Sequence, residues 1–384
     1  MEARENAALA IGRHFAELDD PRVDRRRRHK LIDILVIGIC TVICGGDDYP
    51  SMRGFGKAKE EWLGTFLELP NGIPSSDTFW RVFGALDPDQ FQECFLNWMA
   101  AISTITEGEI VALDGKQLRR SHDKREGKAA IHMVSAWATS NRLVLGQVKV
   151  DEKSNEITAI PELLSRLDLH GCLVTIDAMG CQVDIAEQII EQGGDYLFSL
   201  KGNQSNLHED VELLFDDLEE SNYTAYQYDH DKSVDKGHGR IEIRECWTIS
   251  APEIIRYLRG ANRFTNLQTV VKVRAERYID GKKPTVENRY FIGSATTKAA
   301  EALRATRTHW QVENSLHWIL DIAFREDESR IRKNHGAQNF ALLCHIALNA
   351  LKQETSAKVG IKNKRLKAGW DENYLLKVLS HLQN

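Results

Sequence analysis

Two short apolar runs that each end in an aspartate constrain the fold of this chain more than any other feature. The runs IVALDGK and LVTIDAMG reach Asp114 and Asp177 after four mostly apolar residues, and a small residue follows each aspartate. A short, continuous apolar run is typical of a strand buried on both faces of an α/β sheet. Ligand sites in such sheets lie at the carboxyl ends of the strands, so we expect both carboxylates at one sheet edge.

The segments around these runs predict an α/β mixed sheet. Strand patterns at 131–140 and 142–151 flank Asn141–Arg142 and indicate a hairpin, and helix and strand patterns then alternate up to residue 202. Three strands followed by alternating helices and strands favour a mixed sheet. After an acidic helix at 206–220, residues 238–295 are strand-like again.

The first hundred residues have a helical pattern instead. Apolar positions recur with helical spacing through 31–44, 55–69, 76–86 and 90–103. The segment LPNGIPSSDTFWRVF reads as a helix, a tight turn and a second helix. This is the outline of a helix-turn-helix DNA reader, and also of many ordinary helical pairs.

Charge along the chain leaves nucleic-acid binding open. The net charge of −6 argues against a protein covered with nucleic-acid contacts. However, the segments RVDRRRRHK (22–30) and RIRKNH (330–335) are densely basic, whereas 208–220 is acidic. Local charge governs binding, so a basic groove is compatible with an acidic chain. A basic block is nonetheless more often a solvated face than a binding site.

Other sequence features exclude several classes of protein. The seven cysteines form no CxxC pair, which argues against a zinc ribbon and against a disulfide framework. No apolar run reaches the length needed to cross a membrane, and the N-terminus lacks a signal-peptide pattern. We therefore expect a cytoplasmic protein without membrane contact.

A line of polar residues runs along the helix pattern HWQVENSLHWILD. His309, Glu313, His317 and Asp321 recur at every fourth residue. Two carboxylates on neighbouring parallel strands repel each other unless a cation lies between them. Divalent cations such as Mg²⁺ take oxygen ligands, commonly one or two carboxylates together with a substrate phosphate. We expect Glu313 to be the third carboxylate of such a site, with the two histidines one turn to either side.

Simpler interpretations remain open at this point. Each aspartate on its own is compatible with a strand end or a helix cap, and the polar line with a solvated stripe. Asp321 and the acidic residues 326–328 are rival third ligands. A zinc hydrolase is less favoured, because there is no HExxH motif and the Glu-to-His spacing is i+4, whereas helical di-iron sites use i+3.

Six segments of the chain carry a family resemblance. They are ALDGKQLRRS, TIDAMGCQ, DYLFSLKGNQ, YFIGS, HWQVENSLHWILDIAFRED and RKNHGAQNFALLCHIALN, in that order. Together they resemble the DDE transposases of the H-repeat-associated (ISAs-type) insertion-sequence group, over about residues 20–352. The segments at 20–49 and 69–83 resemble the helical domain that precedes the catalytic domain in this group.

The resemblance implies a fold and a division into parts. The fold is α/β, a ribonuclease-H-like mixed sheet with flanking helices, a β-rich insertion and an N-terminal all-helical domain. The expected parts are an N-terminal helical domain for DNA-end binding (1–105), the first part of the catalytic domain (106–205), an acidic helix and β-rich insertion (206–295), catalytic-domain helices (296–352) and a polar C-terminal tail (353–384).

The resemblance also implies a function. It is that of a transposase that cleaves DNA at insertion-sequence ends and joins the 3′-OH to target DNA by two-metal phosphoryl transfer. By motif position, Asp114, Asp177 and Glu313 form the catalytic, metal-binding triad for two Mg²⁺ or Mn²⁺ ions. The implied partners are element-end and target DNA, with a homo-oligomer on the DNA at the bacterial nucleoid. A nuclease of the same fold that never joins strands, or a non-catalytic DNA-binding relative, are the alternatives.

Basic and polar residues near the expected site are candidate DNA contacts. Such contacts give affinity and register without reading sequence. Relatives outside this group often carry an arginine four residues before the glutamate and a lysine two turns after it. Here those places hold His309 and the Leu320–Asp321 region, and Arg307 is a nearby arginine. The candidates are Lys116, Arg119, Arg120, Lys201, Asn203, His238, Arg240, Arg307 and His309.

Overall fold

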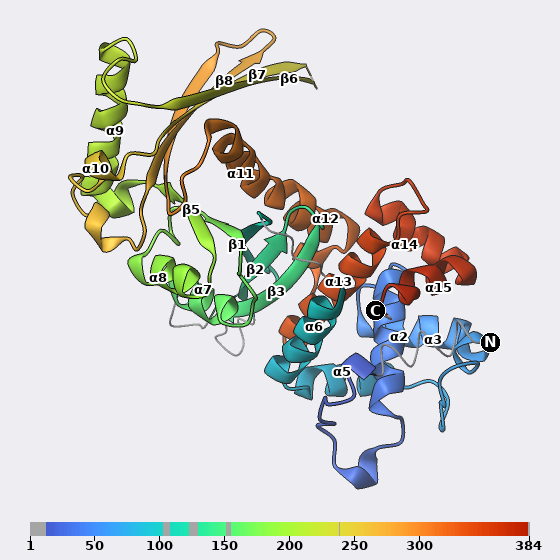
Figure 1. Cartoon of the computed structure of the whole chain (residues 1–384). Coiled ribbons are helices and arrows are strands. Elements are labelled where there is room, and N and C mark those ends of the chain that lie inside the picture. The colour runs from blue at the N-terminus through green and yellow to red at the C-terminus, as the bar shows by residue number, and fades with distance from the viewer. Residues whose placement is uncertain (1–12, 103–107, 123–129, 151–154, 238, 383–384) are drawn as a thin grey trace.

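The two apolar runs that reach the aspartates form parallel neighbours in one sheet, strands β1 (Ile110–Gln117) and β4 (Leu173–Ile176). A computed structural model describes residues 13–102, 108–122, 130–150, 155–237 and 239–382. In Figure 1 a long sheet with its helices lies beside a block of helices, and this block contains the N-terminal helices and the last helices of the described chain.

The sheet has nine strands in the order β3-β2-β1-β4-β5-β9-β8-β7-β6. On one side of β1, β2 (His132–Ala138) and β3 (Leu143–Val150) are antiparallel, and they form the expected hairpin at Asn141–Arg142. On the other side, β4 and β5 (Asp195–Leu200) run parallel to β1. These directions confirm the predicted mixed sheet.

The strand-like stretch at 238–295 extends this same sheet. β9 (Thr285–Gly293) pairs antiparallel with β5, followed outward by β8 (Thr269–Ile279), β7 (Arg240–Ile249) and β6 (Asp229–Gly237). The first half of β8 is buried and its second half is more exposed, so the sheet continues as an arm beyond the core. The expected β-rich insertion is therefore continuous with the core strands.

Helices cover both faces of the sheet (Figure 1). α7 (Glu156–Leu164) contacts β2 and β3, and α8 (Val183–Glu191) contacts β5. α11 (Ala299–Val312) crosses the other face against β1, β4, β7 and β8. It continues through the π-helical segment η4 (Glu313–His317) into α12 (Trp318–Ala323). The acidic helix is α9 (Ser205–Glu220), and the short elements are η1 (Asp24–Arg26), η2 (Gly202–Gln204), α10 (Pro252–Ile255), η3 (Ala261–Arg263) and η5 (Glu326–Glu328).

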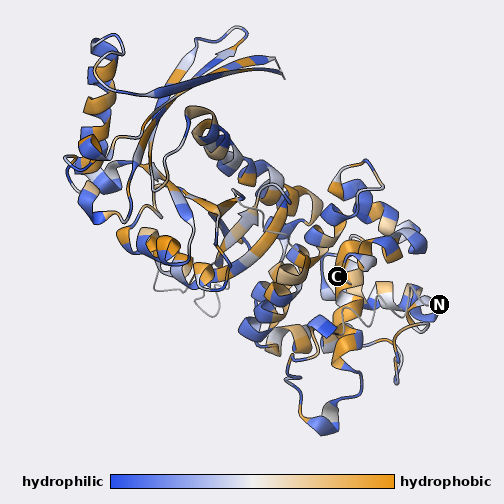
Figure 2. Cartoon of the chain, viewed as in Figure 1, coloured by the Kyte–Doolittle hydropathy of each residue, from blue (hydrophilic) through white to orange (hydrophobic). Residues whose placement is uncertain are grey.

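The helical block combines the two ends of the chain. Its N-terminal helices are α2 (Leu31–Ile43), α3 (Tyr49–Ala58), α4 (Glu60–Leu63), α5 (Ser76–Ala85) and α6 (Pro88–Ile102). α13 (Gly336–Gln353) packs against α2, α5 and α6, and also against β3 of the sheet. Figure 2 shows α2 as a largely hydrophobic helix, which is what burial among other helices requires. The N-terminal helices therefore share their core with a helix from the segment 296–352, where we expected catalytic-domain helices.

Residues 353–384 differ from the polar tail that we expected. They form α14 (Ile361–Trp370) and α15 (Glu372–Ser380), and Leu375, Val378 and Leu379 are buried. We expected a tail because this segment has many lysines and a low mean hydropathy. It nevertheless has three or four apolar residues at helical spacing, and these are enough for a short helix to pack against an existing core.

Two further expectations concern composition. No helix within the described ranges combines the length and apolar character that crossing a bilayer requires. All seven cysteines are described and are free thiols, as the absence of a paired motif predicted.

Candidate metal and nucleic-acid site

Asp114 and Asp177 leave the sheet side by side where β4 stops. The last β1–β4 pair is Leu113 with Ile176, so each aspartate is the next residue on its own chain segment. β1 itself continues to Gln117, and Asp114 lies opposite Ser135 of β2. Asp114 is thus inside strand β1 and not at its end. It still lies beside Asp177, as expected, because the neighbouring strand β4 ends at Ile176.

Glu313 comes to the same place from α11. Asp114, Asp177 and Glu313 line one cavity of about 310 Å³, together with His309 and Lys201. The His309 ring is held in the cavity wall, with its Nδ1 3.1 Å from the Thr175 hydroxyl oxygen. The three carboxylates predicted from the sequence are therefore brought together.

A close group of possible metal ligands at this site has a different third member. Donor atoms of Asp114, Glu313 and His317 all lie within 4.8 Å of one another. His317 Nδ1 is 3.3 Å from Glu313 Oε2 and 3.6 Å from Asp114 Oδ2. Asp177 is outside this group, and its Oδ1 accepts hydrogen bonds from the N–H groups of Met179 and Gly180, at 3.0 and 3.3 Å. Asp177 therefore also caps a turn.

The π-helical segment η4 explains why the polar line stays on one face. In an α-helix a four-residue step advances about 400°, so residues at that spacing drift by about 40° per step. A π-turn closes i→i+5 hydrogen bonds and holds more residues, so a four-residue step across Glu313–His317 falls short of a full turn. The excess rotation in the α-helical turns and the shortfall in the π-turn cancel, so the four polar residues stay on one face. Turns of this type occur often at functional sites.

Crowded negative charge perturbs Asp114. Burial, with a smaller contribution from the carboxylates of Asp177, Glu156 and Glu313, raises the pKa of Asp114 to about 7, against the lowering effect of the Gly115 N–H at 2.9 Å. Burial also lowers the pKa of His317, so its ring is neutral at pH 7. A neutral imidazole beside crowded carboxylates is an arrangement that suits a divalent cation.

The sequence did not single out the contact between His132 and Glu156, which lies close to Asp114. His132 Nε2 on β2 lies 2.6 Å from Glu156 Oε1 at the start of α7. A Cβ on Gly115 would lie 2.2 Å from that carboxylate oxygen, so the pair depends on glycine at this position. Gly115, the small residue after Asp114, was the only sign in the sequence that another side chain packs closely here. No sequence feature near Glu156 marks that residue as the partner.

Comparisons with known proteins identify the family. A family model described as "Transposase DDE domain" matches residues 104–350, and a model described as "DDE_Tnp_1-associated" matches residues 12–99. The chain belongs to the DDE transposase family.

Relatives of this DDE transposase family member match almost its whole length. "H repeat-associated putative transposase YhhI" of Escherichia coli strain K12 is 42% identical over 368 residues, 96% of this chain and 97% of the relative. "Putative protein YbfL" of the same strain is 41% identical with the same shares. The resemblance to the H-repeat-associated group is confirmed. The chain also aligns with a cryo-EM structure of the piggyBac transposase synaptic complex with hairpin DNA. The alignment covers 100% of this chain and 78% of the piggyBac chain, with 10% sequence identity and a TM-score of 0.44.

In this transposase-family chain Lys116 is engaged internally. Its Nζ lies 2.6 Å from both Asp321 Oδ1 and Glu326 Oε2, and its side chain is only 11% exposed. Its ammonium group therefore has two carboxylate partners and is turned away from solvent. Asp321 and Glu326, two of the four rival third ligands, neutralise this lysine.

The remaining predicted DNA contacts lie at different depths. Arg119 and Arg120 are exposed, and Arg119 Nε is 3.2 Å from Asp327 Oδ2. Lys201 lines the same cavity as the three carboxylates, whereas Asn203 Nδ2 donates to the Ala178 carbonyl oxygen at 2.6 Å. His238 lies outside the described residues.

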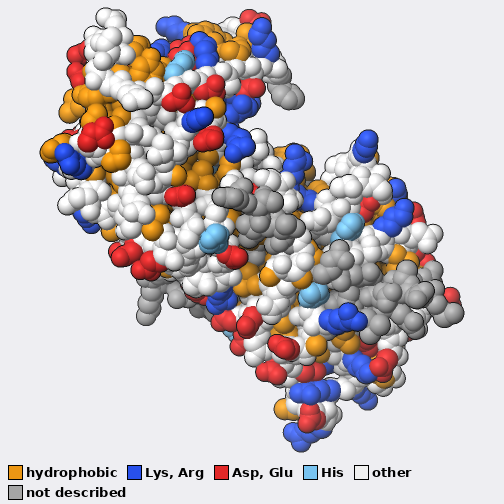
Figure 3. Space-filling model, viewed as in Figure 1, with side chains coloured by type: hydrophobic (Ala, Val, Ile, Leu, Met, Phe, Trp, Pro, Cys, Tyr) orange, Lys and Arg blue, Asp and Glu red, His pale blue; other side chains and the backbone are white. Residues whose placement is uncertain are grey.

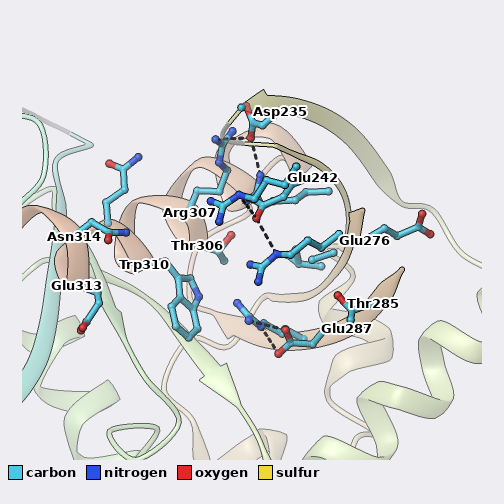
Figure 4. Close-up of a pocket in the computed structure, with 18 of the residues that line it drawn as sticks. Asp235, Glu242, Glu276, Thr285, Glu287, Thr306, Arg307, Trp310, Glu313 and Asn314 are labelled. Carbon is cyan, nitrogen blue, oxygen red and sulfur yellow. Dashed lines mark hydrogen bonds and ion pairs between the residues drawn. The ribbon is translucent and has the colours of Figure 1, made fainter. Parts of the chain in front are cut away.

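A second, larger groove of about 760 Å³ adjoins the first cavity (Figure 4). It lies between the β6–β9 arm and α11, and both cavities are lined by Arg289, Trp310 and Glu313. The Arg289 guanidinium lies 4.4 Å from the centre of the Trp310 ring. The groove is rich in arginine, and its basic residues are Lys236, Arg240, Arg244, Arg277, Arg289 and Arg307.

Carboxylates hold these arginines in the groove. Arg307 Nη2 lies 2.8 Å from Asp235 Oδ2, and Arg240 Nε lies 3.2 Å from Glu242 Oε1. Basic and acidic side chains are also interspersed over the face shown in Figure 3. A phosphate entering this groove must therefore compete with a carboxylate for each of these two predicted contacts.

Proposed function

We propose that this chain is a DNA transposase that cleaves at insertion-sequence ends and joins the resulting 3′-OH to target DNA. The observation that carries the proposal is the convergence of Asp114, Asp177 and Glu313 on one cavity, from three separate chain segments. Membership of the DDE transposase family and the names of full-length relatives support it.

We assign β1–β5 with α7, α8 and α11 to a ribonuclease-H-like catalytic fold. Support comes from the strand order, with two antiparallel steps on one side of β1 and two parallel steps on the other. In this assignment β6–β9 are an insertion between β5 and the helix that carries Glu313.

The residues of the cavity fit the divalent metal that the family implies. The donors are carboxylates, and among the described residues no Lys or Arg forms an ion pair with Asp114, Asp177 or Glu313. Mg²⁺ or Mn²⁺, in two copies, when bound to these three residues supplies an activated nucleophile and stabilises charge on the leaving oxygen. No serine or tyrosine is assigned a covalent role.

Other side chains of the cavity and groove position the DNA. Lys201 lies in the cavity wall and provides a cation for the reacting phosphate. Arg119, Arg120, Arg240 and Arg307 hold the DNA backbone farther away. Arg119, Arg240 and Arg307 exchange their carboxylate partners for phosphates. Lys116 is not retained among these contacts, because its two carboxylate partners occupy it.

The helical block recognises the ends of the element in this proposal. Arg25, Arg27 and Arg28 of the basic block are exposed, and a turn at 70–75 precedes α5. Binding occurs in the cytoplasm on nucleoid DNA, with a homo-oligomer assembled on the paired ends.

The test of this function is the substitution Glu313→Gln. It removes a charge and keeps the side-chain size, so we expect Mg²⁺-dependent nicking of an end-containing DNA to fall by at least about 10³-fold, with end binding retained. Nicking at the wild-type rate would remove Glu313 from the mechanism. Strand transfer from a pre-cleaved end separates a transposase from a nuclease of the same fold, which would nick without joining. Wild-type protein that binds ends without nicking would identify a non-catalytic relative.

A further inference from the structure

We propose that His317 is a direct nitrogen ligand of the divalent metal, together with Asp114 and Glu313. This inference rests on the proposed function and goes beyond its three-carboxylate set. It makes the site a mixed nitrogen and oxygen site, with Asp177 as the more distant carboxylate.

The distances between donor atoms match coordination of one ion. Metal–oxygen distances of about 2.1 Å place two ligands about 3 Å apart at a right angle and about 4.2 Å apart in opposition. His317 Nδ1 lies 3.3 Å from Glu313 Oε2 and 3.6 Å from Asp114 Oδ2, within this interval. An ion can therefore enter between the three groups with small side-chain adjustments.

The His317 ring presents only one nitrogen to the carboxylates. The side chain is 6% exposed, so packing holds its orientation. Nε2 is buried, and among the described residues it has no hydrogen-bond partner. Nδ1 faces the carboxylates of Asp114 and Glu313, so coordination uses this atom. The backbone of η4 sets the direction, because His317 is the last residue of the π-turn that begins at Glu313.

The surrounding charges favour a cation at this position. Lys116, the nearest buried ammonium, is paired with Asp321 and Glu326 and leaves Asp114 and Glu313 uncompensated. Asp177 lies outside the tight group, and two backbone N–H groups already engage its Oδ1. His317 is thus better placed than Asp177 to complete the first ion's ligands.

A nitrogen ligand changes which metals the site prefers. Carboxylates suit Mg²⁺ and Mn²⁺ alike, whereas imidazole raises affinity for transition metals along the Irving–Williams order. We expect the site to bind Mn²⁺ more tightly than Mg²⁺, and this preference to depend on His317. If His317 only donates a hydrogen bond to Glu313, both metals should lose affinity equally when it is replaced.

The first experiment detects the nitrogen directly. Full-length protein loaded with Mn²⁺ is examined by pulsed electron paramagnetic resonance for coupling between the electron spin and ¹⁴N. We expect the coupling in the wild type, its loss in His317→Gln and its persistence in His309→Gln, a control histidine that lines the carboxylate cavity one turn before Glu313. Bound Mn²⁺ without nitrogen coupling, or coupling that survives His317→Gln, would overturn the proposal.

The second experiment measures preference. Titration should give a Mn²⁺ affinity about tenfold weaker in His317→Gln, with Mg²⁺ competition changed much less. Equal losses for both metals would support a hydrogen-bonding role and overturn direct ligation. Circular dichroism and thermal melting establish that each variant is folded.

A replacement ligand provides a result that misfolding cannot imitate. In His317→Cys a thiolate occupies the same position, and bound Co²⁺ should then show a sulfur-to-metal charge-transfer band that His309→Cys lacks. A folded His317→Cys protein that binds Co²⁺ without this band contradicts the proposal. None of these readouts requires DNA cleavage, so a protein that fails to nick would reject the proposed function and leave the ligand assignment standing.

Discussion

At the scale of single residues, the carboxyl of Asp114 links the cavity to stability. Burial raises its pKa to about 7, so in metal-free buffer the folded protein keeps a proton that the unfolded chain releases near pH 4. The folded state is therefore progressively penalised between about pH 4 and pH 7. A bound cation relieves this penalty, because it replaces the proton.

We predict that Asp114→Asn stabilises the metal-free protein, and more at pH 8 than at pH 5. The amide cannot ionise, so the penalty that wild-type protein carries above pH 7 is absent. The expected change in the mutant-minus-wild-type unfolding free energy between these pH values is on the order of 1–3 kcal/mol. Denaturant unfolding in chelator-containing buffer measures it. A difference that does not vary with pH would contradict the raised pKa.

The sequence allowed the three carboxylates to be predicted because each carries a local signal. Asp114 and Asp177 end apolar runs, and Glu313 stands in a polar line on an otherwise apolar helix. The His132–Glu156 pair carries no such signal, since it forms only when β2 and α7 pack together. Lys116 was assigned to phosphates because the sequence does not reveal that Asp321 and Glu326, 205 and 210 residues later, reach its ammonium group.

At the scale of elements, the ion pairs of Lys116 hold the helix that follows Glu313 against the sheet. Lys116 lies on β1, Asp321 on α12 and Glu326 on η5. Apolar periodicity could not predict the π-turn between α11 and α12, because this periodicity shows which face of a helix is buried and not which backbone hydrogen bonds it forms. The strict four-residue polar repeat was an indirect sign of it, because an uninterrupted α-helix spreads such a repeat around its axis.

We predict that Lys116→Met destabilises the protein by about 3–5 kcal/mol, because it leaves buried Glu326 without its cation. Equilibrium urea unfolding measures the change. The triple variant Lys116→Met, Asp321→Leu, Glu326→Met should recover most of the loss, since it removes all three charges together. A single variant as stable as the wild type would show that the ion pairs do not hold α12 in place.

At the scale of the whole molecule, one buried arginine ties the two ends of the chain to the catalytic segment. Arg365 of α14 donates to the Val42 carbonyl oxygen at the end of α2, from Nε at 2.9 Å and Nη2 at 2.7 Å. It also donates to the Ala323 carbonyl oxygen at the end of α12, and Nη2 lies 3.2 Å from Asp47 Oδ1. Sequence periodicity could not reveal this, because the contact joins residues more than 300 positions apart.

We predict that Arg365→Met loosens α2 and α12 together. Removing the guanidinium leaves carbonyl oxygens unpaired and should cost about 3 kcal/mol or more, and Arg365→Lys should not restore it, because a point charge cannot replace a planar fork of donors. Hydrogen exchange should quicken in both 31–43 and 318–323 and remain unchanged in β6–β9.

Arg325→Met is the matched control, since this exposed arginine also lies near Asp47, at 3.9 Å, but its side-chain hydrogen bonds go to Glu328 and, among the described residues, not to the Val42 or Ala323 carbonyl oxygen. Its exchange pattern should match the wild type. Because α12 continues from η4, which begins at Glu313, faster exchange confined to α14 in Arg365→Met would mean that the helical block and the carboxylate cavity are mechanically separate. Faster exchange in both helices would mean that one side chain keeps the helical block and the catalytic helix in a common arrangement.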